Sequence, residues 1–128
     1  MTATLHSYGK IPDLNEAVEL SVIVATLTGC DLKQLDDPEA IAALLSECVN
    51  ASGMTLIHQY VHKFQPCGVT GAAVLAESHV AIHTWPHQGM LFVDIATCSS
   101  MYCAKAAFEC ICKLVPHTDI RIKDLSLA

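Results

Sequence analysis

Between Thr55 and Thr97 the sequence contains a run of strand-like segments with no room for a helix between them. In the first of these segments, side chains alternate so that His58, His62 and Phe64 share one side of the expected strand. Short turns containing Gly or Pro separate the segments, as is typical of neighbouring antiparallel strands. The expected strands cover residues 55–64, 70–76, 78–84 and 90–97.

Two helical segments flank this run of strands. Two aspartates at 36–37 precede Pro38, which is typical of a helix start, and Gly53 is placed to end that helix. A serine at 99 or 100 can cap a second helix, which Pro116 ends. The apolar residues at helical spacing predict two inner faces. These are Ile41, Leu44, Leu45, Cys48 and Val49 in the first helix, and Met101, Ala104, Phe108, Ile111 and Val115 in the second.

The order of elements predicts the fold class. A β-branched segment over 19–28 reads as a first strand and an alternating segment over 119–125 as a last one, whereas residues 1–12 read as a loose arm. We expect an α+β fold, a two-layer sandwich with two helices on one face of a largely antiparallel sheet. Residues 1–128 are expected to form a single domain. The sheet's other face must be covered, and we expect a second copy to cover it in a homodimer that forms a larger sandwich.

Composition excludes several classes of partner. Thirteen acidic residues outnumber seven basic ones, and no stripe of Lys or Arg could follow a nucleic-acid backbone. No apolar run reaches the length of a membrane span and no secretory signal opens the chain, so we expect a cytoplasmic protein. The seven cysteines are odd in number, and we expect reduced thiols, most of them small core hydrophobes. The cysteines in this group are Cys30, Cys48, Cys67, Cys103, Cys110 and Cys112.

The stretch over residues 75–98 holds more reactive groups than a structural hairpin requires. It contains a Glu-Ser pair, three histidines, the only tryptophan and Cys98. A serine hydrolase is disfavoured, because the Gly-x-Ser-x-Gly elbow is missing and Glu77 is adjacent to Ser78 rather than placed to orient a base. Ser78 can instead attack the carbonyl of Glu77; β-elimination and loss of ammonia then leave a pyruvoyl group. That reaction needs a strained peptide, a polarising hydroxyl and a nearby base.

Metal binding is disfavoured by spacing. His58 with His62, and His79 with His83, are four residues apart, about 13 Å on a strand, which is too far to share one ion. A Cys-x-x-Cys pair is also missing. We therefore expect no metal, with His58 and His62 as polar sheet residues and Trp85 as a packed aromatic.

One string of residues resembles a known family. Ala-Glu-Ser-His-Val-Ala-Ile-His-Thr-Trp-Pro at 76–86 follows Phe-Gln-Pro-Cys-Gly-Val-Thr-Gly at 64–71 and precedes Asp94 and the pair 97–98. Together they resemble the prokaryotic S-adenosylmethionine decarboxylase proenzyme family. The resemblance implies a pyruvoyl-dependent decarboxylase of polyamine and spermidine biosynthesis, which releases CO2 from S-adenosylmethionine through a Schiff base without pyridoxal phosphate or metal.

The resemblance also implies self-cleavage. The chain would divide between Glu77 and Ser78 into a β chain of residues 1–77 and an α chain of residues 78–128. Ser78 would become the pyruvoyl group, and His83 matches the processing base.

Further site residues follow from the same resemblance. Cys98 matches the proton donor of the reaction, and Phe64 matches an aromatic that stacks on the substrate's adenine. Thr70 stands where the family has a serine whose hydroxyl assists processing, and His87 stands where it has a glutamate that binds the ribose. Because substrate residues differ while processing residues match, L-ornithine and L-arginine remain alternative substrates. A non-catalytic binding or regulatory subunit is a further alternative.

Overall fold

The computed structural model describes residues 18–127, so the expected arm over residues 1–12 lies outside the described residues. In chain order the elements are β1 (Leu20–Thr28), α1 (Leu32–Leu35), α2 (Pro38–Ser52), β2 (Leu56–Lys63), β3 (Val69–Leu75), β4 (Ser78–Trp85), the 3₁₀ helix η2 (Pro86–Gln88), β5 (Met90–Thr97), α3 (Met101–Leu114) and β6 (Asp119–Leu127). Every strand expected from the sequence is present.

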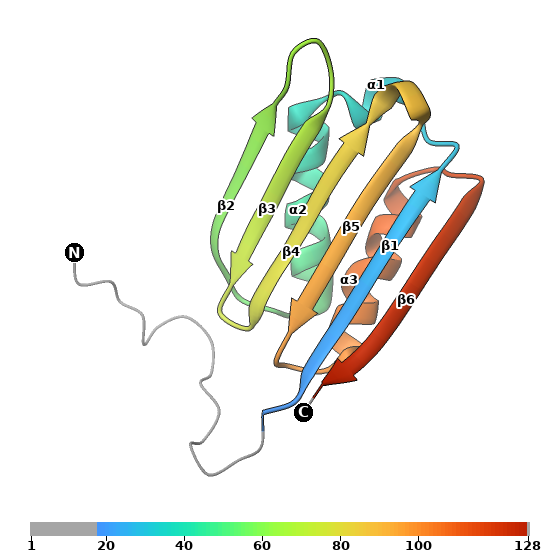
Figure 1. The fold of residues 1–128 in the computed structure, drawn as a ribbon. Helices are drawn as coiled ribbons and strands as arrows, with labels where there is room; N and C mark the ends of the chain where they lie inside the picture. Colours follow the sequence, from blue (N-terminus) through green and yellow to red (C-terminus); the bar gives the residue numbers. More distant parts are fainter. Residues whose placement is uncertain (1–17, 128) are drawn as a thin grey trace, which may run out of the picture.

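The six strands form one sheet in the order β2-β3-β4-β5-β1-β6. All neighbouring strands pair antiparallel, and the two long helices α2 and α3 lie against the same face (Figure 1). The predicted α+β two-layer sandwich is therefore confirmed. The homodimer stays a prediction.

Local sequence explains where the long helices begin and end. The Asp37 carboxylate accepts the N–H of Glu39 at 3.0 Å, Pro38 occupies the first turn of α2, and Gly53 ends the helix with a φ of 75°. The Ser100 hydroxyl accepts the N–H of Cys103 at 3.2 Å at the start of α3. Both predicted helix starts are confirmed.

The core lies between the two long helices and the sheet face that they cover. All five residues predicted for the inner face of α2 are buried, as are four of the five predicted for α3, and Met101 packs partly buried against the same core. The strands contribute the alternate residues that point toward the helices. The largest fully buried side chains include Ile23, Leu27, Ile82, Leu91 and Ile95.

Two short elements were missed from the sequence. The four-residue helix α1 is capped by Asp31, whose carboxylate accepts the N–H of Gln34 at 3.3 Å, and η2 follows Trp85. Each is too short to show a helical repeat of apolar residues. The last strand also extends to Leu127, two residues beyond the predicted end.

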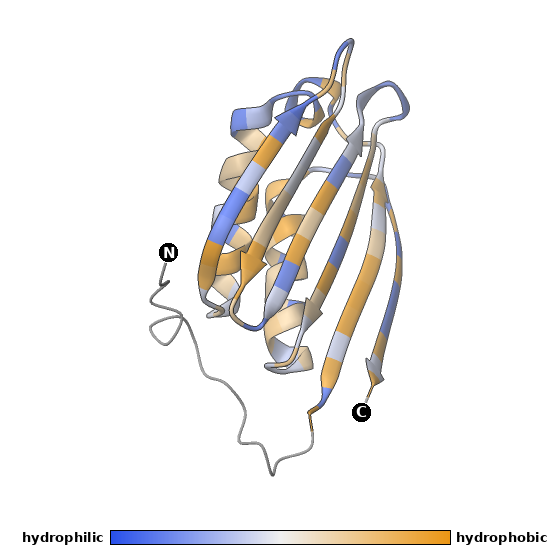
Figure 2. Ribbon diagram, turned by 60° about the vertical axis from the view of Figure 1, so that its left-hand side comes forward, coloured by the Kyte–Doolittle hydropathy of each residue, from blue (hydrophilic) through white to orange (hydrophobic). Residues whose placement is uncertain are grey.

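The second face of the sheet carries no helix within residues 18–127 (Figure 1). Its side chains are half-buried or exposed, and Val74 retains 48 % of its accessible surface. Figure 2 shows that hydrophobic residues run along much of β1, while β4 and β5 alternate in polarity. An uncovered sheet face with this apolar content is the surface that the predicted second copy would cover. Among the described helices, none is long and apolar enough to cross a membrane.

The cysteines differ in their surroundings. Cys48 is fully buried, and burial raises the pKa of its thiol to about 12. Four others pack partly buried against the core. The expectation of a core position is wrong for Cys67, which lies in the β2–β3 loop and lines a cavity. The partly buried four are Cys30, Cys103, Cys110 and Cys112.

We predict that Gly71→Ala destabilises the fold, because an added Cβ would lie 2.8 Å from the Leu45 side chain and 3.2 Å from Val61. Overpacking of this kind costs about 1–3 kcal/mol in the free energy of unfolding, measured by urea denaturation. The double variant Gly71→Ala/Leu45→Val should be more stable than the sum of the two single effects. Strict additivity would show that the contact with Leu45 is not the cause.

Candidate active site

Ser78 has an unusual backbone conformation at the start of β4. Its φ is 147°, and it is the one non-glycine residue with positive φ among residues 18–127. Such conformations cost about 1–3 kcal/mol and persist only where the surroundings impose them. Here the antiparallel ladders place Ser78 opposite Leu75 on one side and Thr97 on the other. The peptide bond between Glu77 and Ser78 therefore joins a tight turn to a strained residue.

Cys98 lies beside this peptide bond. Its N–H donates a 2.9 Å hydrogen bond to the carbonyl oxygen of Glu77. A donor at this oxygen polarises the carbonyl and stabilises negative charge that develops there during nucleophilic attack. The sheet thus brings together Glu77, Ser78 and Cys98, three of the residues predicted from the sequence.

Thr70 and His83 form a second group on the neighbouring strands β3 and β4. They are direct cross-strand partners, and the Thr70 hydroxyl lies 3.0 Å from His83 Nδ1. The His83 ring also stacks on Phe92, with ring centroids 6.0 Å apart. Because Nδ1 contacts Thr70, Nε2 is the ring nitrogen available to another group.

Within one chain the two groups do not meet. His83 is five residues beyond Ser78 on the same strand, a distance of about 16 Å by strand rise. The side chains of β4 that share a face with His83 are His79, Ala81 and Trp85, whereas Val80 and Ile82 point into the core. Within one chain His83 therefore does not reach Ser78, because an extended strand carries the histidine away.

A cavity of about 520 Å³ adjoins the second group. Aromatic rings form part of its wall, and no carboxylate is among its lining residues. Trp85 is 45 % exposed, so the expectation of a packed aromatic is wrong. The predicted residues Phe64 and His87 both line this cavity, together with Gln65, Cys67, Gly68, Thr70, His83, Thr84, Trp85, Pro86 and Gln88.

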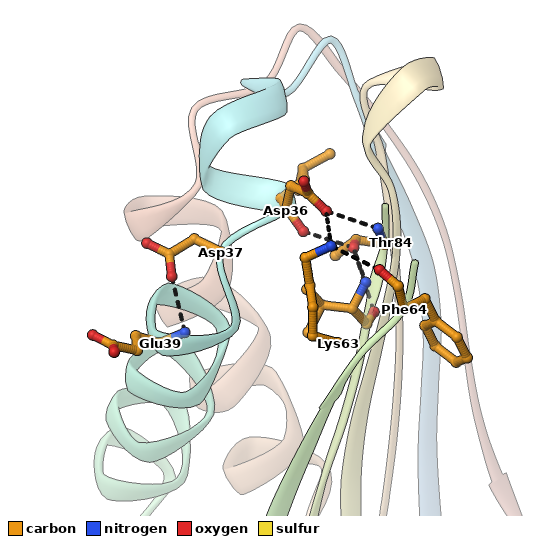
Figure 3. Close-up of polar contacts among 9 residues, drawn as sticks. Asp36, Asp37, Glu39, Lys63, Phe64 and Thr84 are labelled. Carbon is orange, nitrogen blue, oxygen red and sulfur yellow. Dashed lines mark hydrogen bonds and ion pairs between the residues drawn. The ribbon is translucent and has the colours of Figure 1, made fainter. Parts of the chain in front are cut away.

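Asp36 fixes the loop that bears Phe64. Its carboxylate accepts the N–H of Gly68 at 2.8 Å and lies 3.1 Å from the Lys63 ammonium, which also donates to the Phe64 carbonyl at 2.7 Å (Figure 3). The Phe64 ring points away from these polar contacts in Figure 3. The hydrogen bond from Gly68 and then the contact with Lys63 lower the pKa of Asp36.

Asp36 could not be assigned this role from the sequence, where it was expected to take part in a helix start. Its neighbour Asp37 is the cap, and the turn between α1 and α2 directs Asp36 toward the loop after β2. Thr84 strengthens the same junction, because its hydroxyl donates to the Leu35 carbonyl at 2.7 Å and accepts the N–H of Val69 at 2.9 Å.

His79 and Asp94 form a further pair on the uncovered face, with His79 Nε2 2.7 Å from the Asp94 carboxylate. The sequence alone assigns His79 no role, because the pair forms across two strands. His58 and His62 lie exposed on β2, where they were expected as polar sheet residues. Within the described part of the chain, no three His, Cys, Asp or Glu side chains are grouped to hold a metal ion.

Comparisons with known proteins agree on one family. The profile of the S-adenosylmethionine decarboxylase family matches residues 21–126. An S-adenosylmethionine decarboxylase proenzyme from Methanococcus maripaludis strain C7 is 41 % identical over 103 residues, which cover 80 % of this chain and 84 % of the relative. The proenzyme from Methanococcus vannielii is 50 % identical over 76 residues, which cover 59 % of this chain and 62 % of the relative.

A solved structure extends the agreement to the fold. The adenosylmethionine decarboxylase from Aquifex aeolicus VF5 superposes with a TM-score of 0.81 at 34 % identity, covering 86 % of this chain and 91 % of the other. The fold and site define a small α+β protein in which Ser78 lies at a strained strand start. This chain belongs to the S-adenosylmethionine decarboxylase family.

We predict that Asp36→Ala frees the Gly68 amide, whose hydrogen exchange, measured by NMR, should accelerate severalfold. The matched variant Lys63→Met removes the ion pair but keeps the Gly68 bond, so its effect should be smaller. The pKa of Asp36 is lowered on folding, so its contribution is present at neutral pH and is lost as the pH falls through the lowered pKa. Equal exchange rates in the wild type and Asp36→Ala would contradict this role.

Proposed function

We propose that this chain is a self-processing decarboxylase that forms its own pyruvoyl group and releases CO2 from S-adenosylmethionine in polyamine biosynthesis. The observation that carries the proposal is the geometry at one peptide bond: the Glu77 carbonyl accepts the N–H of Cys98, and Ser78 is held at a strained φ. A strained residue directly after a hydrogen-bonded carbonyl is the arrangement that attack by the Ser78 hydroxyl on that carbonyl would use.

Processing would use only groups of the protein and one water molecule. The Ser78 hydroxyl forms a bond to the Glu77 carbonyl carbon, the C–N bond breaks, and the hydroxyl proton passes to the new amine. A base then removes the Ser78 α-proton, the bond from Cβ to oxygen breaks, and Glu77 leaves as a carboxylate. The resulting dehydroalanine tautomerises to an imine, and water releases ammonia from it to leave the pyruvoyl group.

The base for this elimination would come from a second copy. His83 lies about 16 Å from Ser78 along β4 of the same chain, whereas the uncovered sheet face has room for a partner. In a two-fold dimer each contact occurs twice. A two-fold axis that passes midway between the positions of Ser78 and His83 along β4 would bring His83 of each chain to Ser78 of the other. We infer a homodimer with two composite sites.

The contact between Thr70 and His83 suits this role. With its proton on Nδ1 donated to the Thr70 oxygen, His83 keeps a lone pair on Nε2 and can act as a base there. The Thr70 hydroxyl is then free to donate to a carbonyl oxygen of the partner chain. Threonine in place of serine keeps the required hydroxyl, with its oxygen 3.0 Å from the ring nitrogen.

The same residues serve the decarboxylation. When formed, the pyruvoyl group supplies an electrophilic carbonyl for the substrate's amine and an electron sink as CO2 leaves. Cys98 stands at the end of β5 beside this position and would return a proton to the product carbon. A reducing cytoplasm suits this task, because it keeps Cys98 as a thiol.

The cavity supports a substrate with an aromatic ring. Phe64 and Trp85 offer apolar rings beside His83, and a volume of about 520 Å³ is in the range of small-ligand sites. His87 replaces the carboxylate that the family resemblance would place there, which removes an acceptor for the ribose hydroxyls. For this reason the assay of CO2 release also includes L-ornithine and L-arginine as alternative substrates.

We expect mass spectrometry of freshly purified protein to show two fragments, residues 1–77 and a pyruvoyl-blocked 78–128. Ser78→Ala should remain a single chain, because the nucleophile is gone. The cleaved protein should release CO2 from S-adenosylmethionine in preference to ornithine or arginine, and Cys98→Ala should lower this rate about 10²–10⁴-fold. A wild-type chain that stays whole after long incubation would point to the non-catalytic subunit instead.

Mixed dimers test the composite site. Ser78→Ala should not cleave, and His83→Ala should cleave about 10²–10⁴-fold more slowly than the wild type. When the two variants are mixed, the His83→Ala chain should cleave, since its Ser78 meets the intact His83 of its partner. The double variant Ser78→Ala/His83→Ala is the matched control and should give no rescue. Absence of rescue in proven mixed dimers would contradict a site shared between chains.

A further inference from the structure

Thr55 contacts the turn that precedes the reactive serine. It stands one residue before β2, and its N–H donates to Glu77 Oε1 at 2.9 Å while its hydroxyl donates to Glu77 Oε2 at 3.3 Å. Its carbonyl accepts the N–H of Ala76 at 2.9 Å. Three hydrogen bonds therefore connect Thr55, directly before β2, to Ala76 and Glu77, the two residues of the turn between β3 and β4.

These bonds hold Glu77 from the side opposite to Cys98. The carbonyl oxygen of Glu77 is fixed by the Cys98 N–H at 2.9 Å, and its carboxylate is fixed by Thr55. With both the side chain and the carbonyl anchored, the peptide plane before Ser78 cannot rotate freely. Surroundings that determine the geometry in this way are what a strained φ of 147° requires.

A turn of this kind does not need such an anchor for stability alone. Hairpin turns are satisfied by their own backbone, and a glutamate in one is ordinarily solvated. Here both carboxylate oxygens are bonded to a single residue about twenty positions earlier in the chain. The anchor lies on the one turn that carries the bond to be broken.

We propose that Thr55 is a positioning residue for self-cleavage, acting through Glu77 to present the carbonyl carbon of Glu77 to the Ser78 hydroxyl. The inference rests on the proposed function. The step it serves is the acyl shift: the bond from Ser78 Oγ to the Glu77 carbonyl carbon forms, the C–N bond breaks, and the hydroxyl proton moves to the Ser78 nitrogen. His83 acts in the later elimination, so the two residues affect different steps.

The test follows precursor cleavage over time in freshly translated full-length chain. Thr55→Val removes the hydroxyl and keeps the shape, so cleavage should slow about fivefold, and Glu77→Ala should slow it at least about tenfold. Thr55→Ser keeps the hydroxyl and should cleave within about twofold of the wild type. The matched control is Ser46→Ala, which removes a 3.3 Å side-chain bond between α2 and β2 and should leave cleavage unchanged.

Hydroxylamine, which cleaves esters, separates positioning from a general loss of structure. In His83→Ala the acyl shift proceeds and the ester accumulates, so hydroxylamine should release the fragments. In Thr55→Val the ester forms slowly, so hydroxylamine should not accelerate cleavage. Glu77→Gln keeps one acceptor oxygen and should fall between Glu77→Ala and the wild type.

The outcomes distinguish the two proposals. A wild-type chain that cleaves while Thr55→Val cleaves equally fast would overturn the role of Thr55 alone. A Thr55→Ser chain as slow as Thr55→Val would also overturn it, because the hydroxyl would then not be the active feature. A wild-type chain that never cleaves would overturn the proposed function and this inference with it.

Discussion

The antiparallel register of β4 between β3 and β5 is the constraint on which the site depends. It places Ser78 opposite Thr97, so that Cys98 emerges beside the Glu77 carbonyl, and it places His83 opposite Thr70. Since side chains alternate along a strand, a slip of one residue would turn His83 into the core and separate both contacts. The burial of the alternate residues of β4, such as Ile82, in the core beneath α2 keeps this register. Stability of the core and geometry of the site therefore come from the same strand.

The uncovered face links assembly to chemistry. The helices cover one face of the sheet, and the titratable side chains His79, His83 and Asp94 of β4 and β5 lie on the other face. Ser78 and His83, the nucleophile and base of the proposed mechanism, lie about 16 Å apart along β4, and no rotation of side chains closes that distance. In the proposed homodimer, packing two such faces would cover apolar surface and would bring His83 of one chain to Ser78 of the other. An isolated chain would then fold without a complete site.

Local patterns predicted the architecture well, since strand alternation, Pro38 with its capping aspartate and Gly53 are signals that neighbouring residues carry. The contacts that define the site were less accessible. Asp36 was read as part of a helix start, and its bond to Gly68 depends on a turn that no periodic pattern marks. The anchor of Glu77 on Thr55 and the pair of His79 with Asp94 also join separate strands. Such contacts follow from register, which the sequence specifies only once the whole sheet is assembled.

The departures from the family pattern divide into two kinds when they are placed in the structure. Threonine at position 70 is a good strand residue, and its hydroxyl reaches His83 at 3.0 Å, so the added methyl group leaves the hydrogen bond intact. Histidine at position 87 changes the chemistry of the cavity, since an imidazole accepts one hydrogen bond where a carboxylate can accept two from a diol. After the Gly68 hydrogen bond and the contact with Lys63, nearby His87 adds the smallest contribution to the lowered pKa of Asp36. In the proposed mechanism, Thr70 keeps the hydroxyl that processing needs, while His87 at the cavity end of the sheet would affect which amine substrate is accepted.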